Sequence, residues 1–164
     1  MTLDSNPKTF PLNQALNFDF SHDTNIASIL TAFGLTQFAD VLPADHIVED
    51  RQLIVSHMEP FATRLDIEII KTPSPLNGDR SDGDKYEDGG PTKYVHMSLC
   101  QRTIPLGISY KPCGDRDDGW CELKTFLDVL STKLEEAEYE YSCFGDYDAV
   151  PYGSLHNGVP QAKS

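Results

Sequence analysis

His22 and Asp23 are the residues of this sequence whose types and setting could act on a phosphoryl group. They stand between a strand-like segment and a helix-like segment, where free backbone N–H groups and the helix dipole attract anions. A histidine there can donate to a phosphoryl oxygen, and an aspartate there can protonate a leaving alkoxide as a general acid. The alternative is structural: Asp23, Thr24 or Asn25 only caps the helix, and His22 is a turn residue.

The elements that must position this pair are predicted from hydrophobic periodicity. Leu16–Phe20 alternates apolar and polar residues, as a strand does. Four apolar residues then follow at helical spacing, and Gly34 should end that helix: Ile26, Ile29, Leu30 and Phe33. We therefore expect a unit of strand, polar turn and helix, with His22 and Asp23 in the turn.

Further along the chain, alternating patterns predict antiparallel strands. Leu65–Ile69 and Val95–Leu99 each alternate, and Thr103–Leu106 should be a short hairpin partner that Pro105 confines to an edge. The segment 72–91 is rich in Pro, Gly, Asp and Ser, so we expect an exposed loop.

The C-terminal third predicts one long helix. Its apolar residues are Trp120, Leu123, Leu127, Leu130 and Leu134, and Asp117 or Asp118 should cap it. A shorter helix is expected through Phe38. Residues 155–164 are expected to be a mobile tail.

Size and charge limit the function classes. A chain of 164 residues suits one ordinary domain. The formal net charge of −13 argues against a nucleic-acid partner and gives no support for docking on anionic membranes. No apolar run approaches the length of a membrane span, and the N-terminal residues do not form a signal peptide. The acidic loop Asp79–Asp88 fails the EF-hand register, so no metal site is expected. No P-loop or dinucleotide fingerprint occurs, and no cofactor is expected.

Four cysteines give mixed signals about the redox environment. Their spacing is not that of zinc knuckles. Cys113 and Cys121 enclose a short polar loop that a local disulfide could close, which suits an oxidising compartment. The lack of a visible signal peptide favours the cytosol instead, and a chain that has lost its true N-terminus would reconcile the two observations.

Several ordered blocks resemble fungal histidine acid phosphatases, the group that includes phytases. The resemblance covers most of the chain in the right order and is interrupted by the Asp/Gly-rich loop. The matching blocks are Leu3–Asn13, Phe18–Ile26, Ile29–Leu35, Pro60–Leu65, Gln101–Leu106, Cys113–Cys121 and Tyr141–Tyr147.

The resemblance implies roles for named residues. His22 would help to hold the phosphoryl group, and Asp23 would protonate the leaving oxygen. Cys113 and Cys121 would form a local disulfide, and Cys143 would bridge to an upstream cysteine that this sequence does not contain. The family's nucleophile lies in an Arg-His-Gly-x-Arg-x-Pro motif, and no Arg-His-Gly occurs here.

The same resemblance implies an architecture. Residues 1–154 would be the C-terminal part of a single α/β-sandwich catalytic domain. They would supply a central strand-turn-helix unit, an antiparallel edge group and a C-terminal helix. Because the central strand would lack neighbours, we expect the isolated chain to be marginally stable or prone to aggregation.

The implied function is a secreted acid phosphatase. It would hydrolyse phosphomonoesters, with phytate as a candidate substrate, through a phosphohistidine intermediate and without a cofactor. This chain would hold only the proton-donor half of the site and be inactive alone, and the missing N-terminal part of the fold would be its partner. The alternative is a non-catalytic acidic interaction module derived from that fold.

Overall fold

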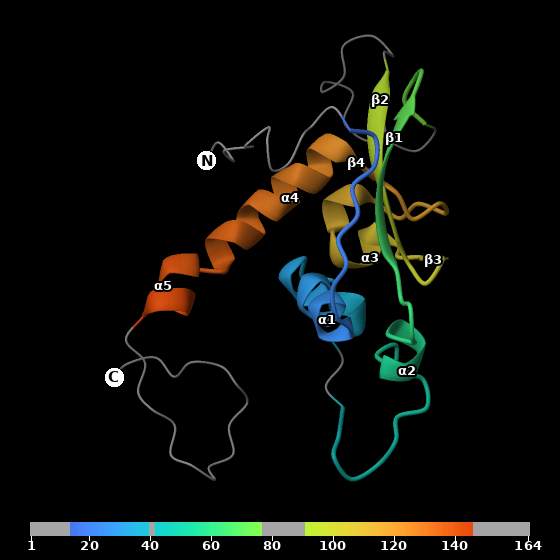
Figure 1. The fold of residues 1–164 in the computed structure, drawn as a ribbon. Helices are drawn as coiled ribbons and strands as arrows, with labels where there is room; N and C mark the ends of the chain where they lie inside the picture. Colours follow the sequence, from blue (N-terminus) through green and yellow to red (C-terminus); the bar gives the residue numbers. More distant parts are fainter. Residues whose placement is uncertain (1–13, 40–41, 77–90, 146–164) are drawn as a thin grey trace.

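The computed structural model describes residues 14–39, 42–76 and 91–145. Helices and a four-stranded antiparallel sheet make up a mixed α/β arrangement, which confirms the predicted fold class (Figure 1). In chain order the elements are α1 (Asp23–Ala32), the 3-10 helix η1 (Thr36–Phe38), α2 (Val55–Met58), β1 (Leu65–Thr72), β2 (Thr92–Leu99), β3 (Arg102–Thr103), α3 (Leu106–Ser109), the 3-10 helix η2 (Lys111–Cys113), β4 (Cys121–Glu122), α4 (Leu123–Glu136) and α5 (Tyr139–Phe144).

The sheet is centred on β2. β1 pairs with β2 along its whole length, with Leu65 opposite Leu99, and β3 and β4 pair with different parts of β2. Side chains alternate between the two sheet faces. One face of β2 therefore carries Val95, Met97 and Leu99, and the other carries Tyr94 and His96.

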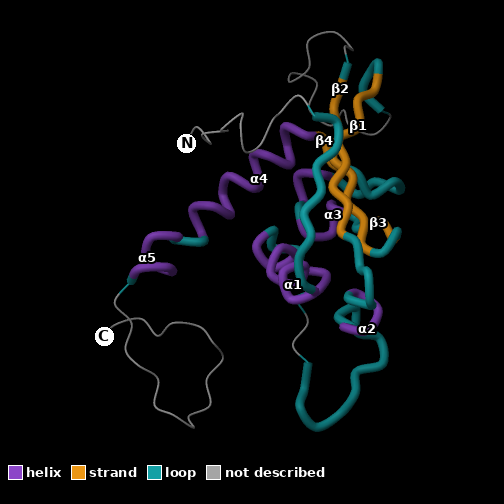
Figure 2. Tube along the Cα trace, viewed as in Figure 1, coloured by secondary structure: helices purple, strands orange, loops and turns teal. Residues whose placement is uncertain are grey.

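The core lies between β2 and the helices. Figure 2 shows α1, α3 and the start of α4 on the same side of the β1–β2 ladder, while the rest of α4 and α5 extend away from it. Buried side chains from the three helices join those of β2 in one cluster, which includes Leu30, Leu106, Phe126, Val95 and Met97. None of the helices in the described ranges is long and apolar enough to span a bilayer.

Helix α1 ends as the sequence predicts. Gly34 adopts φ of +65°, the left-handed conformation that glycine accepts without steric cost. Its N–H donates to the carbonyl of Thr31 at 2.8 Å, and the N–H of Leu35 donates to that of Leu30 at 3.2 Å. This pair of bonds is the Schellman motif, which satisfies the last carbonyls of a helix.

The predicted strand at Leu16–Phe20 does not form in this structure. Residues 14–21 belong to no helix or strand, and Leu16, Phe18 and Phe20 are exposed. A strand exists only when a neighbour takes up its backbone N–H and C=O groups. No described residue pairs with this segment.

Three other boundaries differ from the prediction. β3 ends at Thr103, and Leu106 begins α3, so the hairpin partner is shorter than Thr103–Leu106. Helix α4 begins at Leu123 rather than near Trp120. Its N-cap residue is Glu122, and neither predicted aspartate caps it, because Asp118 is engaged within its own loop.

Most of the predicted loop 72–91 and the whole predicted tail 155–164 lie outside the described residues. The first residue of the predicted loop, Thr72, is the last residue of strand β1.

Candidate active site at the start of helix α1

His22 is the N-cap residue of α1. Its backbone is extended, with φ of −108° and ψ of 162°, and its carbonyl accepts the N–H of Asn25 at 3.1 Å. The imidazole makes no capping bond, so it is not used to build the helix. The structure therefore places His22 at the helix N-terminus, as predicted, with its side chain exposed.

Asp23 is the first residue of α1. Its carboxylate oxygen Oδ1 accepts the N–H of Thr24 at 2.7 Å. The neighbouring Asn25 side chain donates to the Ser21 hydroxyl, which ties the turn to the first helical residues. The Asp23 side chain is exposed at the surface. The N-cap position belongs to His22, so none of the three predicted candidates, Asp23, Thr24 or Asn25, is the N-cap residue.

Both side chains of the pair are exposed, and the site is open. Among the described residues, no side chain forms a hydrogen bond or an ion pair with the imidazole of His22. The guanidinium of Arg64 is held by Asp66, two residues away, and that of Arg116 by Asp118. Neither arginine is therefore free to act as a phosphate clamp.

A shallow surface hollow lies elsewhere in the molecule. It is lined by the consecutive residues Glu138, Tyr139, Glu140 and Tyr141 at the start of α5. Figure 1 shows α5 well apart from α1. The hollow therefore does not enlarge the His22–Asp23 site.

The opposite face of the sheet carries a second polar cluster that sequence reasoning missed. The His96 ring lies between the carboxylate of Glu68, at 2.7 Å from Nδ1, and the hydroxyl of Thr103, at 2.9 Å from Nε2. These residues come from β2, β1 and β3, so three adjacent strands are joined by side chains. His96 is structural, and the alternation of β1 and β2 is the sequence signal that could have paired it with Glu68.

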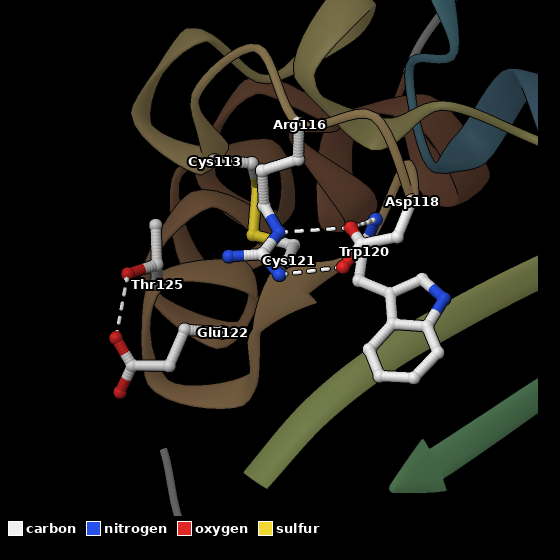
Figure 3. Close-up of a disulfide and its surroundings, with 7 residues drawn as sticks. All are labelled: Cys113, Arg116, Asp118, Trp120, Cys121, Glu122 and Thr125. Atoms are coloured by element: carbon white, nitrogen blue, oxygen red, sulfur yellow. Dashed lines mark hydrogen bonds and ion pairs between the residues drawn. A yellow bond between two sulfur atoms is a disulfide. The ribbon is translucent and has the colours of Figure 1, made fainter. Parts of the chain in front are cut away.

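The loop closed by Cys113 and Cys121 covers that face. The two cysteines form the expected disulfide, with an S–S distance of 2.02 Å. Inside the loop, Arg116 donates twice to Asp118, from Nε at 2.9 Å and from Nη2 at 2.6 Å, as Figure 3 shows. Asp118 also accepts the backbone N–H of Trp120 at 2.9 Å.

Aromatic contacts join this loop to the sheet. The Trp120 ring lies 6.2 Å from the ring of Tyr94 and 6.0 Å from that of His96. The guanidinium of Arg116 lies 5.2 Å from the centroid of the Tyr94 ring, within cation–π distance. The hydrogen bond from Arg116 is the largest cause that lowers the pKa of Asp118 below its usual value. These contacts hold the loop against the sheet.

The two remaining cysteines are free thiols in this structure. Cys143 lies exposed on α5, and the upstream cysteine that the resemblance implied as its partner is not in the sequence. Cys100 is half-buried, with its Sγ 3.7 Å from the carbonyl of Met58 and from the Thr63 hydroxyl.

Comparison with known proteins places the chain in a family. The family model described as the histidine phosphatase superfamily (branch 2) matches residues 1–99, which include the His22–Asp23 pair. The chain is similar to Phytase A of Aspergillus awamori, at 44% identity over 73 residues, which are 43% of this chain and 16% of that protein.

Longer matches reach into the disulfide-containing half. Phytase A of Aspergillus oryzae is 37% identical over 133 residues, 79% of this chain and 24% of that protein. Phytase A of Arthroderma benhamiae is 33% identical over 132 residues, 79% of this chain and 25% of that protein. The chain thus spans about a quarter or less of the length of the curated relatives it matches. It belongs to branch 2 of the histidine phosphatase superfamily.

Proposed function

We propose that this chain supplies the proton-donor half of a phosphomonoester hydrolase. His22 donates a hydrogen bond to a phosphoryl oxygen, and Asp23, in its protonated form, gives its proton to the leaving alkoxide. The main observation in support is that this pair lies at the N-terminus of α1. Both side chains are exposed, and the imidazole makes no capping hydrogen bond to the helix. The two roles follow from that placement and from membership of the family.

The other half of the chemistry comes from outside the described residues. A phosphohistidine intermediate needs a second histidine as nucleophile and cations around the phosphoryl group, because phosphoryl transfer depends on positioning and electrostatic stabilisation. The sequence contains no Arg-His-Gly. The chain alone is therefore expected to be inactive. A protonated Asp23 also predicts an acidic optimum for the complete site.

Phytate is the first substrate to test. The relatives in the comparison are named Phytase A, and phytate is a phosphomonoester with several phosphoryl groups. The net charge of −13 does not favour an anionic substrate at neutral pH, whereas at acidic pH many of the carboxylates are neutral. Simple phosphomonoesters and phytate should therefore be compared side by side.

A secreted location fits this function. The disulfide between Cys113 and Cys121 suits an oxidising compartment. Cytosolic reductants keep most thiols reduced, so a closed disulfide in the native protein would support secretion. Mass spectrometry of the protein from its natural source, without added reductant, tests this point.

The decisive test is phosphate release at acidic pH. The full chain is assayed alone and after co-expression with the rest of the Aspergillus oryzae relative, from which the matched 24% is removed. We expect turnover only in the combined preparation. Asp23→Asn should lower it by roughly 10²-fold or more, the usual range for a general acid. Asp45→Asn changes an exposed aspartate outside the site and should have no effect.

The outcome separates this proposal from the acidic interaction module. If Asp23→Asn and His22→Ala leave the turnover of the combined preparation unchanged, the pair is not part of the chemistry. If no preparation releases phosphate, the non-catalytic module becomes the better account.

A further inference from the structure

Helix α1 carries the candidate pair at one end and is packed into the fold toward the other. His22 and Asp23 are exposed, and Leu30, in the last turns, is the buried residue of the helix. Leu30 belongs to the hydrophobic core, and the C-cap residue Phe33 packs against the same core. The contacts that place the helix in the fold are therefore concentrated toward its C-terminal end.

A side-chain hydrogen bond joins this end of α1 to a distant part of the chain. The hydroxyl of Tyr110 donates to the carbonyl of Phe33. The last carbonyls of a helix have no partner within the helix, so an outside donor satisfies one of them here. Among the described residues, no other hydrogen bond joins α1 or Phe33 to a residue distant in the sequence.

The Tyr110 side chain is itself firmly held. It is 2% exposed, and its ring lies 5.9 Å from that of Phe126, which also lies 6.1 Å from the ring of Phe33. The backbone N–H of Tyr110 donates to the carbonyl of Leu106, and its carbonyl accepts the N–H of the disulfide residue Cys113, both at 2.8 Å. Burial raises the pKa of Tyr110 to about 12, so the phenol keeps its proton and remains a donor.

The residue before Tyr110 supports the same junction. The hydroxyl of Ser109 donates to the side-chain oxygen of Gln37 and accepts the hydroxyl of Thr36 at 3.3 Å. Both partners belong to η1, which follows directly after the end of α1. Two consecutive residues therefore bind polar groups at the place where α1 passes into η1.

We propose that Tyr110 is a positioning residue of the candidate site. Through the carbonyl of Phe33 it holds α1, and it thereby sets where His22 and Asp23 lie. The inference rests on the proposed function, because the pair must meet a phosphoryl group, and it adds a residue that is distant from the pair and acts through the helix. Without this hydroxyl, the end of α1 is held by apolar contacts, which are not directional.

Hydrogen exchange of the full chain tests the anchoring of α1. Tyr110→Phe removes the hydroxyl and keeps the ring. We expect the amides of α1 to exchange at least about tenfold faster, and those of β2 to change less, because α1 then opens locally more easily. The matched control is Tyr94→Phe, since the Tyr94 hydroxyl accepts the backbone N–H of Leu76 at 2.9 Å. It also removes a buried hydroxyl and should not increase exchange in α1 relative to β2.

Two leaving groups test the positioning of the acid. The combined preparation is assayed with β-glycerophosphate, whose leaving alkoxide takes a proton from Asp23, and with p-nitrophenyl phosphate, whose nitrophenolate leaves without one. Tyr110→Phe should lower the ratio of the two kcat/KM values by about tenfold, because a displaced acid affects the first substrate alone. A loss of folded protein lowers both values equally, so Tyr94→Phe should leave the ratio unchanged. In an Asp23→Asn background, Tyr110→Phe should not change the ratio further.

The inference is overturned if Tyr110→Phe leaves exchange in α1 as it is in the unaltered chain. It is also overturned if the kcat/KM ratio stays unchanged in a preparation where Asp23→Asn lowers it, or if Tyr94→Phe lowers the ratio equally. Failure of the proposed function gives a different result. In that case Asp23→Asn does not change the ratio, or no preparation releases phosphate, and the exchange experiment still decides whether Tyr110 holds α1.

Discussion

The carboxylate of Glu68 lies 2.7 Å from Nδ1 of His96, across the pair of strands β1 and β2. The histidine side chain is only 18% exposed, because Trp120 of the disulfide loop lies over the same face. The other ring nitrogen meets the hydroxyl of Thr103 on β3. This contact therefore fixes the mutual positions of three strands at a place where no helix supports them.

Removing the contact between Glu68 and His96 should destabilise the sheet. We expect a coupling free energy of about 0.5–1 kcal/mol between the two side chains, the usual size for a cross-strand pair. A double-mutant cycle with Glu68→Gln and His96→Gln, followed by urea unfolding, measures it. Glu49→Gln is the control, since Glu49 is an exposed glutamate outside this cluster. A coupling near zero would mean that the contact contributes nothing in solution.

A glycine in the turn between β2 and β3 should increase the stability of the protein. Cys100 and Gln101 form a two-residue hairpin loop with φ of +49° and +66°, and Leu99 pairs with Arg102 around it. Two left-handed residues define a type I′ turn, which favours Asn-Gly. Gln101→Gly should stabilise the protein by about 1 kcal/mol, because glycine adopts this conformation without strain.

The matched control for the turn is Gln101→Ala. It removes the same side chain but keeps a Cβ in the left-handed region, so no gain is expected. An equal rise in the urea midpoint for alanine and glycine would show that the glutamine side chain, not the backbone, is responsible.

Opening the disulfide should cost about 2–3 kcal/mol of unfolding free energy. The bond closes a short loop with a sequence separation of 8, and a loop of that length restricts the unfolded chain by roughly this amount. Cys113→Ser with Cys121→Ser is the variant, and urea unfolding is the measurement. Cys143→Ser removes an exposed free thiol and should change nothing. Equal stability of the double variant and the unaltered chain would contradict a structural role for this bond.

The lowered pKa of Asp118 predicts that the protein loses stability in strong acid. Its pKa is lowered in the folded chain, first by the hydrogen bond from Arg116, so the folded state binds a proton there less readily than the unfolded chain does. The stabilisation is therefore present above the ordinary value of 3.8 and is lost as the pH falls through the lower folded value. Asp118→Asn should flatten the fall of unfolding free energy in that window. An unchanged acid profile would exclude this carboxylate as a cause.

The isolated chain is predicted to be only marginally stable. Its exposed apolar side chains include Leu16, Phe18, Phe20, Ile67 and Ile69, which remain in water when no partner is present. A thermal scan of the full chain alone should show a broad transition. A cooperative transition from a monodisperse monomer would contradict the prediction.

Local patterns predicted the local elements well. The α1 helix and its end at Gly34 follow from helical spacing and from one residue that tolerates a left-handed backbone. β1 and β2 follow from alternation, although both are longer than predicted. His22 and Asp23 were placed correctly at the helix start because that position depends on adjacent residues alone.

The features that the sequence did not predict correctly depend on contacts between distant residues. The pattern of Leu16–Phe20 describes a strand, but pairing requires a neighbour that the described chain does not provide. Asp118 has the type of a capping residue, yet its carboxylate is used by Arg116 and Trp120 in the loop. The pairing of Glu68 with His96 depends on strand register, which neither segment determines alone.

The anchoring of α1 has a mechanical consequence. The helix is held at its C-terminal end, where Leu30 is buried and the Tyr110 hydroxyl donates to the carbonyl of Phe33. Its ten residues make it about 15 Å long, so a tilt of roughly 10° about that end moves His22 by about 2–3 Å. A misplacement of ~1 Å is already enough to slow catalysis substantially. In the proposed function, the orientation of this helix axis, which is set far from the imidazole, would decide whether the imidazole reaches a phosphoryl oxygen.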